Sequence, residues 1–221
     1  MTPSVILRSA LFALFQLAVT PPYAVVALLT FPCAPLTRYR VIGAEHLPPP
    51  PFIILAKHQS AWETLAFQVV FPPQVWVIKR ELLWIPFFGW GLAMLAPIAI
   101  DRAAGPRALR QMLDQGRDRL AGGFCIVIFP EGTRVAPGTR REYQPGGAWL
   151  AAKTATPVVP VAHNSGEMWR RNAFLKYPGT ITVSIGAPIE TRGLAPEEIN
   201  RRVEDWIENE MLRISGPQRP S

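Results

Sequence analysis

Short apolar runs alternate with amphipathic segments through most of this chain, and this alternation limits the fold more than any other feature. Runs that fit buried strands lie at residues 52–56, 75–78, 96–100, 124–129, 158–162 and 180–185. Apolar residues recur at helical spacing in residues 106–120, 145–154 and 196–214. Strands that alternate with helices indicate an α/β fold. We expect a central mixed β-sheet that is flanked by helices.

The N-terminal segment differs in kind, because residues 9–31 carry no charged side chain. An apolar stretch of ~20 residues is long enough to span a bilayer. Pro21 and Pro22 divide it, and a proline pair should kink or break a helix. The segment could therefore be a kinked span, a two-helix hairpin in one leaflet, or a signal peptide. Arg8 alone is a poor basic start for a signal peptide, and no cleavage site is convincing. We favour a retained membrane anchor, and a hairpin over a straight span.

Charge indicates what the chain can bind. Its net charge of +7 favours anionic partners such as lipid headgroups and phosphate substrates. Nucleic acid is not expected, because lysine and arginine form no dense run.

The two cysteines, Cys33 and Cys125, form no disulfide framework. Cys125 lies in an apolar run, as a small core residue would, and no metal site is predicted. Arg38 and Arg40 follow the anchor closely, which fits a globular part in the cytoplasm. We divide the chain into an anchor at 1–35, a globular domain at 36–215 and a frayed tail at 216–221.

Several apolar runs end in polar or charged residues, and packing alone does not predict this. These residues are Lys57 and His58, Lys79, Asp101 and Arg102, Glu131 and Arg134, and His163 and Asn164. Ligands bind at the carboxyl ends of strands in open α/β sheets. A histidine, carboxylates and several cations at this edge are typical of an enzyme that acts on an anionic substrate.

His58 and Glu63 allow two interpretations. In the first, Ser60 caps a helix and Glu63 reaches back to the Ser60 amide, which is a common arrangement without chemistry. In the second, Glu63 orients His58 as a general base. Residues five apart in one helix diverge by roughly 140°. The two side chains can therefore meet only if His58 precedes the helix and Glu63 lies in its first turn. A Ser60 cap gives that arrangement, so the two interpretations are compatible.

Five sequence blocks, in order, resemble those of the phospholipid and glycerol-phosphate acyltransferase family, most closely its bacterial 1-acyl-glycerol-3-phosphate acyltransferases. The family pattern His-x-x-x-x-Asp is met by His58 and Glu63, with glutamate in place of the usual aspartate. The further blocks are Lys79-Arg80-Glu81-Leu82, Ile100-Asp101-Arg102, Phe129-Pro130-Glu131-Gly132-Thr133-Arg134 and Val158-Val159-Pro160-Val161. The resemblance covers roughly residues 38–190.

The resemblance implies acyl transfer from a thioester, acyl-CoA or acyl-carrier protein, to the free hydroxyl of lysophosphatidic acid. His58 would be the general base and Glu63 would orient it. Lys79 and Arg134 would bind the substrate phosphate, and Glu131 and Gly132 would shape the glycerol-binding turn. Asp101, Arg102 and Thr133 complete the expected substrate site. Backbone amides near the first block would hold the thioester carbonyl.

The same resemblance implies that no cofactor or metal is needed, since a thiolate leaves readily. It places the enzyme at the bacterial inner membrane with its catalytic domain in the cytoplasm. Acylation of glycerol-3-phosphate or of another lysolipid is the nearest alternative. A non-catalytic membrane-binding module would explain the anchor and the charge, but not His58 beside Glu131 and Arg134. A serine hydrolase is disfavoured because the Gly-x-Ser-x-Gly motif is absent.

Overall fold

The computed structural model describes residues 3–30 and 37–215. The chain divides into two compact units, Met1–Leu36 and Thr37–Ser221, which are considered separately below. Cys33 and the tail after residue 215 lie outside the described residues.

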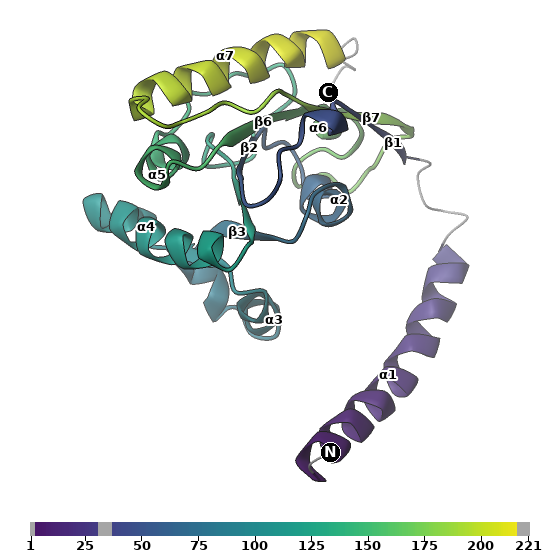
Figure 1. Ribbon diagram of the computed structural model, residues 1–221. Coiled ribbons are helices and arrows are strands. Elements are labelled where there is room, and N and C mark those ends of the chain that lie inside the picture. The colour runs from purple at the N-terminus through teal and green to yellow at the C-terminus, as the bar shows by residue number, and fades with distance from the viewer. Residues whose placement is uncertain (1–2, 31–36, 216–221) are drawn as a thin grey trace. The chain divides into compact units, whose positions relative to one another are not determined.

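The first unit contains a single helix, α1, at Pro3–Thr30 (Figure 1). Among the described residues it is the one helix long and apolar enough to cross a membrane, with a mean hydropathy of 1.5 over Ser4–Pro22. It is therefore a candidate membrane anchor. The preference for two helices was wrong for this structure, because α1 continues through Pro21 and Pro22. Each proline lacks an N–H donor and its ring crowds the carbonyl four residues earlier, yet α1 runs through the pair as one helix.

The second unit is an α/β domain. Its strands are β1 Thr37–Ile42, β2 Ile53–Ala56, β3 Gln74–Lys79, β4 Ile98–Ile100, β5 Cys125–Ile128, β6 Val158–His163 and β7 Gly179–Ile185. Its α-helices are α2 Trp62–Val70, α3 Phe88–Met94, α4 Pro106–Ala121, α5 Gly146–Thr154, α6 Ser165–Met168 and α7 Pro196–Ile214. Short 3-10 helices are η2 Ala44–His46, η3 Arg80–Trp84 and η4 Arg102–Ala104.

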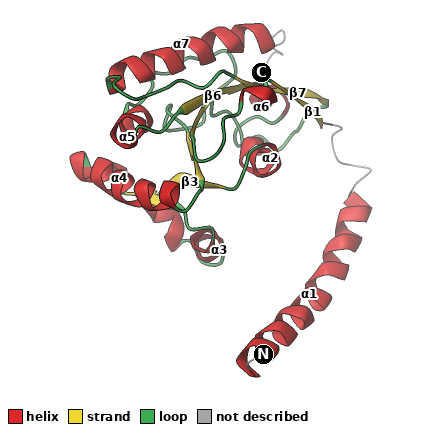
Figure 2. Cartoon of the chain, in the orientation of Figure 1, coloured by secondary structure: helices red, strands yellow, loops and turns green. Residues whose placement is uncertain are grey.

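The strands form one mixed sheet, as expected, and the order of the strands is β1-β7-β6-β2-β5-β3-β4. Figure 2 shows helices around the strands. The five strands from β6 to β4 are parallel to one another, so their carboxyl ends lie at one edge. At the other side of the sheet β7 runs antiparallel to β6, and β1 is parallel to β7. The parallel strands thus bring the polar residues that follow β2, β3, β4, β5 and β6 to the same edge.

Alternating side chains of the buried strands fill two core layers. Ile53 and Leu55 of β2 pack in the layer covered by α4, α5 and α7. Ile54 and Ala56 face the opposite layer, which is covered by α2. Figure 1 shows these helices on the two sides of the sheet. At Gly147 of α5, an added Cβ would lie 2.6 Å from the Leu55 side chain, so this glycine lets α5 approach β2 closely.

Six of the seven described strands and the long helices lie within about two residues of the predicted ranges, whereas β1 at Thr37–Ile42 was not among the predicted runs. Cys125 is a buried core residue, as expected. The strand expected at 96–100 begins only at Ile98, because Ala96 has a φ of +48°, outside the extended region. The aromatic stretch after β3 forms η3 and α3, and its side chains do not enter the core. Phe87 is 80% exposed and Trp84 is 67% exposed.

Candidate active site

His58 and Glu63 meet at the carboxyl end of β2. His58 lies in the loop between β2 and α2, and Glu63 is in the first turn of α2. The His58 Nδ1 and Glu63 Oε1 atoms are 2.7 Å apart. Ala61, and not Ser60 as expected, is the N-cap residue of α2. Glu63 nevertheless accepts from the Ser60 amide at 2.9 Å, and Ser60 Oγ accepts from the Trp62 amide, so these turn contacts and the His58–Glu63 contact coexist.

The Glu63 carboxylate is fully buried and heavily hydrogen-bonded. Besides His58 and the Ser60 amide, it accepts from the Gln59 amide at 3.0 Å, Ser60 Oγ at 2.8 Å and Ser165 Oγ at 3.0 Å. Burial alone would raise the pKa of Glu63, but its interactions with His163, His58 and Ser60 outweigh burial and lower the pKa to about 2. Glu63 is thus ionised at neutral pH and can only accept hydrogen bonds. His58 must donate through Nδ1, which leaves the lone pair on Nε2.

The His58 ring is fixed by packing as well. It stacks on Phe129, with ring centroids 3.8 Å apart and an angle of 9° between the planes. The side chain is 17% exposed. No other described residue forms a hydrogen bond with its Nε2. A proton acceptor with fixed orientation and some access to substrate is what general-base catalysis requires.

Glu131 follows β5, and its side chain points inward. Its Oε2 accepts from the His58 amide at 2.7 Å, and its Oε1 lies 2.7 Å from Lys57 Nζ. Both oxygens are therefore engaged by the protein and the side chain is fully buried. We expected Glu131 to help shape a substrate-binding turn, and that role stays a prediction. Its carboxylate, however, contacts the backbone of His58.

The residues after β4 and β5 contact each other. The Arg102 guanidinium donates to the Gly132 carbonyl. Gly132 has a φ of +69°, a conformation that glycine adopts without steric cost. Asp101 accepts from the Ala103 amide and from Arg80, both at 3.1 Å. Asp101 therefore stabilises the turn that presents Arg102, and the predicted blocks at residues 100–102 and 129–134 contact each other.

The two cations predicted to bind phosphate lie at the same sheet edge. Lys79 ends β3 and is exposed, while Arg134 and Thr133 are half-buried in the loop after β5. Within the described part of the chain, neither the Lys79 ammonium nor the Arg134 guanidinium has an ion-pair partner. Arg134 is held through its carbonyl, which accepts from Arg171 at 3.1 Å. Both charges are thus free to meet an anion.

A cavity of about 500 Å³ lies at the carboxyl ends of β3, β4 and β5, and neither His58 nor Glu63 is part of its lining. Phe129 and Glu131, which both contact His58, contribute to its wall. Most of the lining is apolar and comes from β3, β4, β5, α4 and α5: Val77, Ile100, Ala108, Leu109, Met112, Ile128, Gly146 and Gly147. Arg102 and Arg141 supply charge. The cavity can therefore accept an apolar group that ends in an anion.

Comparison with known proteins identifies the family. Residues 38–164 match the family model described as Acyltransferase. The chain is 46% identical over 184 residues to the 1-acyl-sn-glycerol-3-phosphate acyltransferase of Pseudomonas aeruginosa, which covers 82% of this chain and 72% of that protein. This chain belongs to the acyltransferase family.

More distant acyltransferases agree. The mouse 1-acyl-sn-glycerol-3-phosphate acyltransferase alpha is 30% identical over 80% of this chain and 63% of its own length. The crystal structure of the 1-acyl-sn-glycerophosphate acyltransferase of Thermotoga maritima aligns with a TM-score of 0.69 at 25% identity, over 82% of this chain and 74% of that one. The resemblance drawn from the five blocks and the α/β fold are both confirmed.

The amides of the first block are mostly occupied in this acyltransferase. Those of His58, Gln59, Ser60 and Trp62 donate to Glu131, Glu63 or Ser60 Oγ. The prediction that amides here hold a thioester carbonyl therefore needs donors other than these four. Among the described residues, no group of three or more histidine, cysteine, aspartate or glutamate side chains could hold a metal.

Several contacts of the site were not predicted from the sequence. Ser165, Phe129 and Lys57 each contact Glu63, His58 or Glu131. Lys57 and Phe129 had a usable signal, since they adjoin predicted blocks at strand ends. Ser165 had none, because only the pairing of β2 with β6 brings it to α2.

Proposed function

We propose that this enzyme transfers an acyl chain from a thioester to the sn-2 hydroxyl of 1-acyl-glycerol-3-phosphate, which gives phosphatidic acid. The observation that carries the proposal is the His58 imidazole, whose Nδ1 is hydrogen-bonded to the buried Glu63 carboxylate and whose Nε2 has no hydrogen-bond partner among the described residues. The relatives in Pseudomonas and mouse carry the name of this activity.

The reaction follows from this geometry. His58 Nε2 takes the proton of the hydroxyl as its oxygen attacks the thioester carbonyl, so that a C–O bond forms. The tetrahedral intermediate breaks its C–S bond, and the imidazolium returns the proton to the leaving thiolate. Ionised Glu63 stabilises the imidazolium in between, as the aspartate does in serine-protease triads. General-base assistance of this kind contributes ~10²–10⁴ in rate.

The surroundings suit an amphiphilic, anionic acceptor. Lys79, Arg134 and Arg102 lie at the sheet edge that carries His58, and arginine can bind phosphate through two parallel hydrogen bonds. The apolar cavity beside Phe129 suits an acyl chain. We place α1 in the membrane and the α/β domain at the cytoplasmic face of the bacterial inner membrane, because Arg38 and Arg40 follow α1.

A panel of acceptors, each assayed with acyl-CoA and with acyl-carrier protein, tests the proposal. The acceptors are 1-acyl-glycerol-3-phosphate, glycerol-3-phosphate, a lysolipid with another headgroup and 1-acyl-glycerol. We expect thiol release and a diacylated product with 1-acyl-glycerol-3-phosphate above all others. Preference for another acceptor would contradict the proposed substrate, and no transfer to any acceptor would contradict the proposed activity.

A further inference from the structure

Lys57, the residue before His58, is a buried cation. Its side chain is 2% exposed, and its Nζ lies 2.7 Å from Glu131 Oε1 and 2.8 Å from Glu208 Oε1. The Tyr143 hydroxyl donates to the same Glu208 oxygen at 2.9 Å. Moving an ammonium group out of water is costly unless carboxylates pair with it. The fold therefore places two carboxylates around Lys57, one of them from α7, 151 residues away in the chain.

A chain of contacts connects this ion pair to His58, the proposed base. Glu208 holds Lys57, Lys57 pairs with Glu131, and Glu131 accepts the amide proton of His58. The Lys57 backbone is fixed separately, since its amide donates to the Val161 carbonyl and its carbonyl is 2.7 Å from His163 Nε2. The Lys57 side chain is thus not needed to keep β2 in place. Its nearest polar contacts are the carboxylates.

We propose that Lys57 is a positioning residue for His58, which acts by holding Glu131 as a carboxylate against the His58 amide. The inference rests on the proposed role of His58 as the base. A charged acceptor binds an amide more strongly than a neutral one, and it fixes the backbone that carries the imidazole. Glu208 joins the terminal helix α7 to this arrangement.

The charges around Glu131 support this role. The pKa of Glu131 is raised above its usual value, mainly by burial and further by Glu208, whereas Lys57 and the His58 amide lower it and so limit the rise. Of the other charged groups nearby, Arg140 interacts with Glu208 and Glu204 interacts with Tyr143. Burial raises the pKa of Tyr143, which stays a neutral donor, and burial lowers the pKa of His163, which favours its neutral form. Lys57 is therefore the cation that opposes protonation of Glu131.

The test compares kcat, acceptor KM and pH profiles for Lys57→Met. With Lys57 gone, Glu131 binds a proton at higher pH, and activity that needs its carboxylate falls as the pH drops through the raised pKa. We expect kcat to fall by about ten- to a hundredfold, as for other misplaced catalytic groups, with acceptor KM within about twofold. The acid limb of the profile should move to higher pH. When Glu131→Gln is added to Lys57→Met, the acid limb should move back to its wild-type position, because glutamine cannot titrate.

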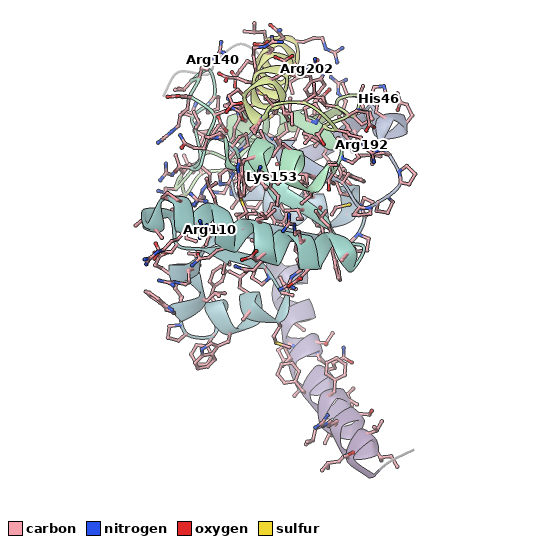
Figure 3. All side chains as sticks on the ribbon, turned by 60° about the vertical axis from the view of Figure 1, so that its left-hand side comes forward. His46, Arg110, Arg140, Lys153, Arg192 and Arg202 are labelled. Atoms are coloured by element: carbon pink, nitrogen blue, oxygen red, sulfur yellow. The ribbon has the colours of Figure 1, made fainter. Side chains whose placement is uncertain are left out.

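The control is Arg140→Met, which removes the same charge from the exposed pair between Arg140 and Glu204 of α7. Arg140 lies on the outer surface (Figure 3). We expect its kcat and acid limb to match the wild type. A Lys57→Met enzyme with wild-type kcat and acid limb would overturn the inference, as would an acid limb that stays displaced after Glu131→Gln is added.

A second comparison holds even if Lys57→Met alone does not fold. Glu131→Gln is compared with Glu131→Gln combined with Lys57→Met, since no buried glutamate is then left unpaired beside His58. If Lys57 acts through Glu131, the second change alters kcat by less than about twofold, because coupled changes are not additive. A further tenfold loss would show a separate role for Lys57 and refute the inference. Failure of the proposed function is recognised separately, because the wild-type enzyme would then transfer no acyl group.

Discussion

Glu63 is a carboxylate without solvent contact, and its hydrogen bonds decide its protonation. Two hydroxyl groups, two amides and the His58 ring surround it. The usual residue at this place in the family is aspartate, which is one methylene shorter. The 2.7 Å contact with His58 shows that the longer side chain still reaches the imidazole while it accepts from the Ser60 amide. The longer side chain therefore still makes the contact that the proposed orienting role requires.

The low pKa of Glu63 predicts how stability depends on pH. Its folded-state pKa of about 2 lies below the value of 4.5 for a free glutamate. The unfolded chain therefore binds the proton first as the pH falls. The stabilisation, about 3 kcal/mol, is fully present above about pH 5 and is lost between about pH 5 and pH 2. We expect Glu63→Gln to be less stable at pH 7 and to lose less stability on acidification, as measured by urea unfolding. If the free energy of unfolding falls equally steeply with pH below pH 5 in both proteins, this prediction is contradicted.

Lys79 and Arg134 are predicted to bind the acceptor phosphate. Each change to alanine should raise the apparent KM for 1-acyl-glycerol-3-phosphate by about ten- to a hundredfold, since a lost charged hydrogen bond costs about 1.5–3 kcal/mol. The measurement is repeated with 1-acyl-glycerol, which lacks the phosphate. An equal loss of activity on that acceptor would show that these cations are not phosphate ligands.

The helix α2 and the loop before it show which part of the site a sequence can predict. The His58–Glu63 contact spans five residues and follows from local rules: a strand end, a turn and a first helical turn. The Lys57–Glu208 pair spans 151 residues and depends on how α7 packs across the sheet. The periodicity of α7 predicted its buried face, but it did not predict that Glu208 reaches a strand end. Local contacts were thus predictable, whereas contacts set by packing between distant elements were not.

The elements η3 and α3 carry an exposed aromatic surface at the end of β3. Trp84 and Trp90 are 67% and 61% exposed, so they are not core residues of the α/β domain. The strands β3, β5 and β2 are parallel neighbours, so their carboxyl ends lie at one edge of the sheet. The aromatic surface follows β3 and His58 follows β2, so both lie at this edge. Large apolar surfaces of this kind mark interaction sites, and tryptophan is favoured at membrane interfaces.

We expect Trp90→Glu to weaken the use of acceptor presented in vesicles, with an apparent KM about three- to tenfold higher. Short-chain acceptor that is dissolved as monomers should be used as well as by the wild type. The matched control is Leu212→Glu, since Leu212 is 83% exposed on α7 and does not belong to η3 or α3. If the short-chain acceptor is affected equally, Trp90 lines the acyl path and does not contact the membrane.

The whole molecule combines an apolar helix with a basic α/β domain. The net charge of +7 favours contact with anionic lipid, and the acceptor is itself a membrane amphiphile. Extracting such a lipid into water costs about 0.8 kcal/mol for each exposed methylene. A catalytic edge that faces the bilayer avoids this cost.

Deleting residues 1–36 tests the anchor. We expect the remaining α/β domain to move to the soluble fraction when membranes are washed with high salt, since screening weakens the contacts of exposed basic residues. Circular dichroism of the released domain checks that it is folded. Sedimentation with membranes as complete as that of the full chain, in the same salt, would contradict the assignment of α1 as the anchor.

The most direct test of the account is the turnover of His58→Ala with 1-acyl-glycerol-3-phosphate and an acyl thioester. His58 is proposed as the base, and Glu63 and Phe129 both position its ring. Loss of the base should lower kcat by ~10² or more, while the melting profile and membrane binding stay those of the wild type. The account is contradicted if the variant has the wild-type melting profile and retains more than about a tenth of the wild-type kcat. Loss of a general base should reduce the rate by more than that.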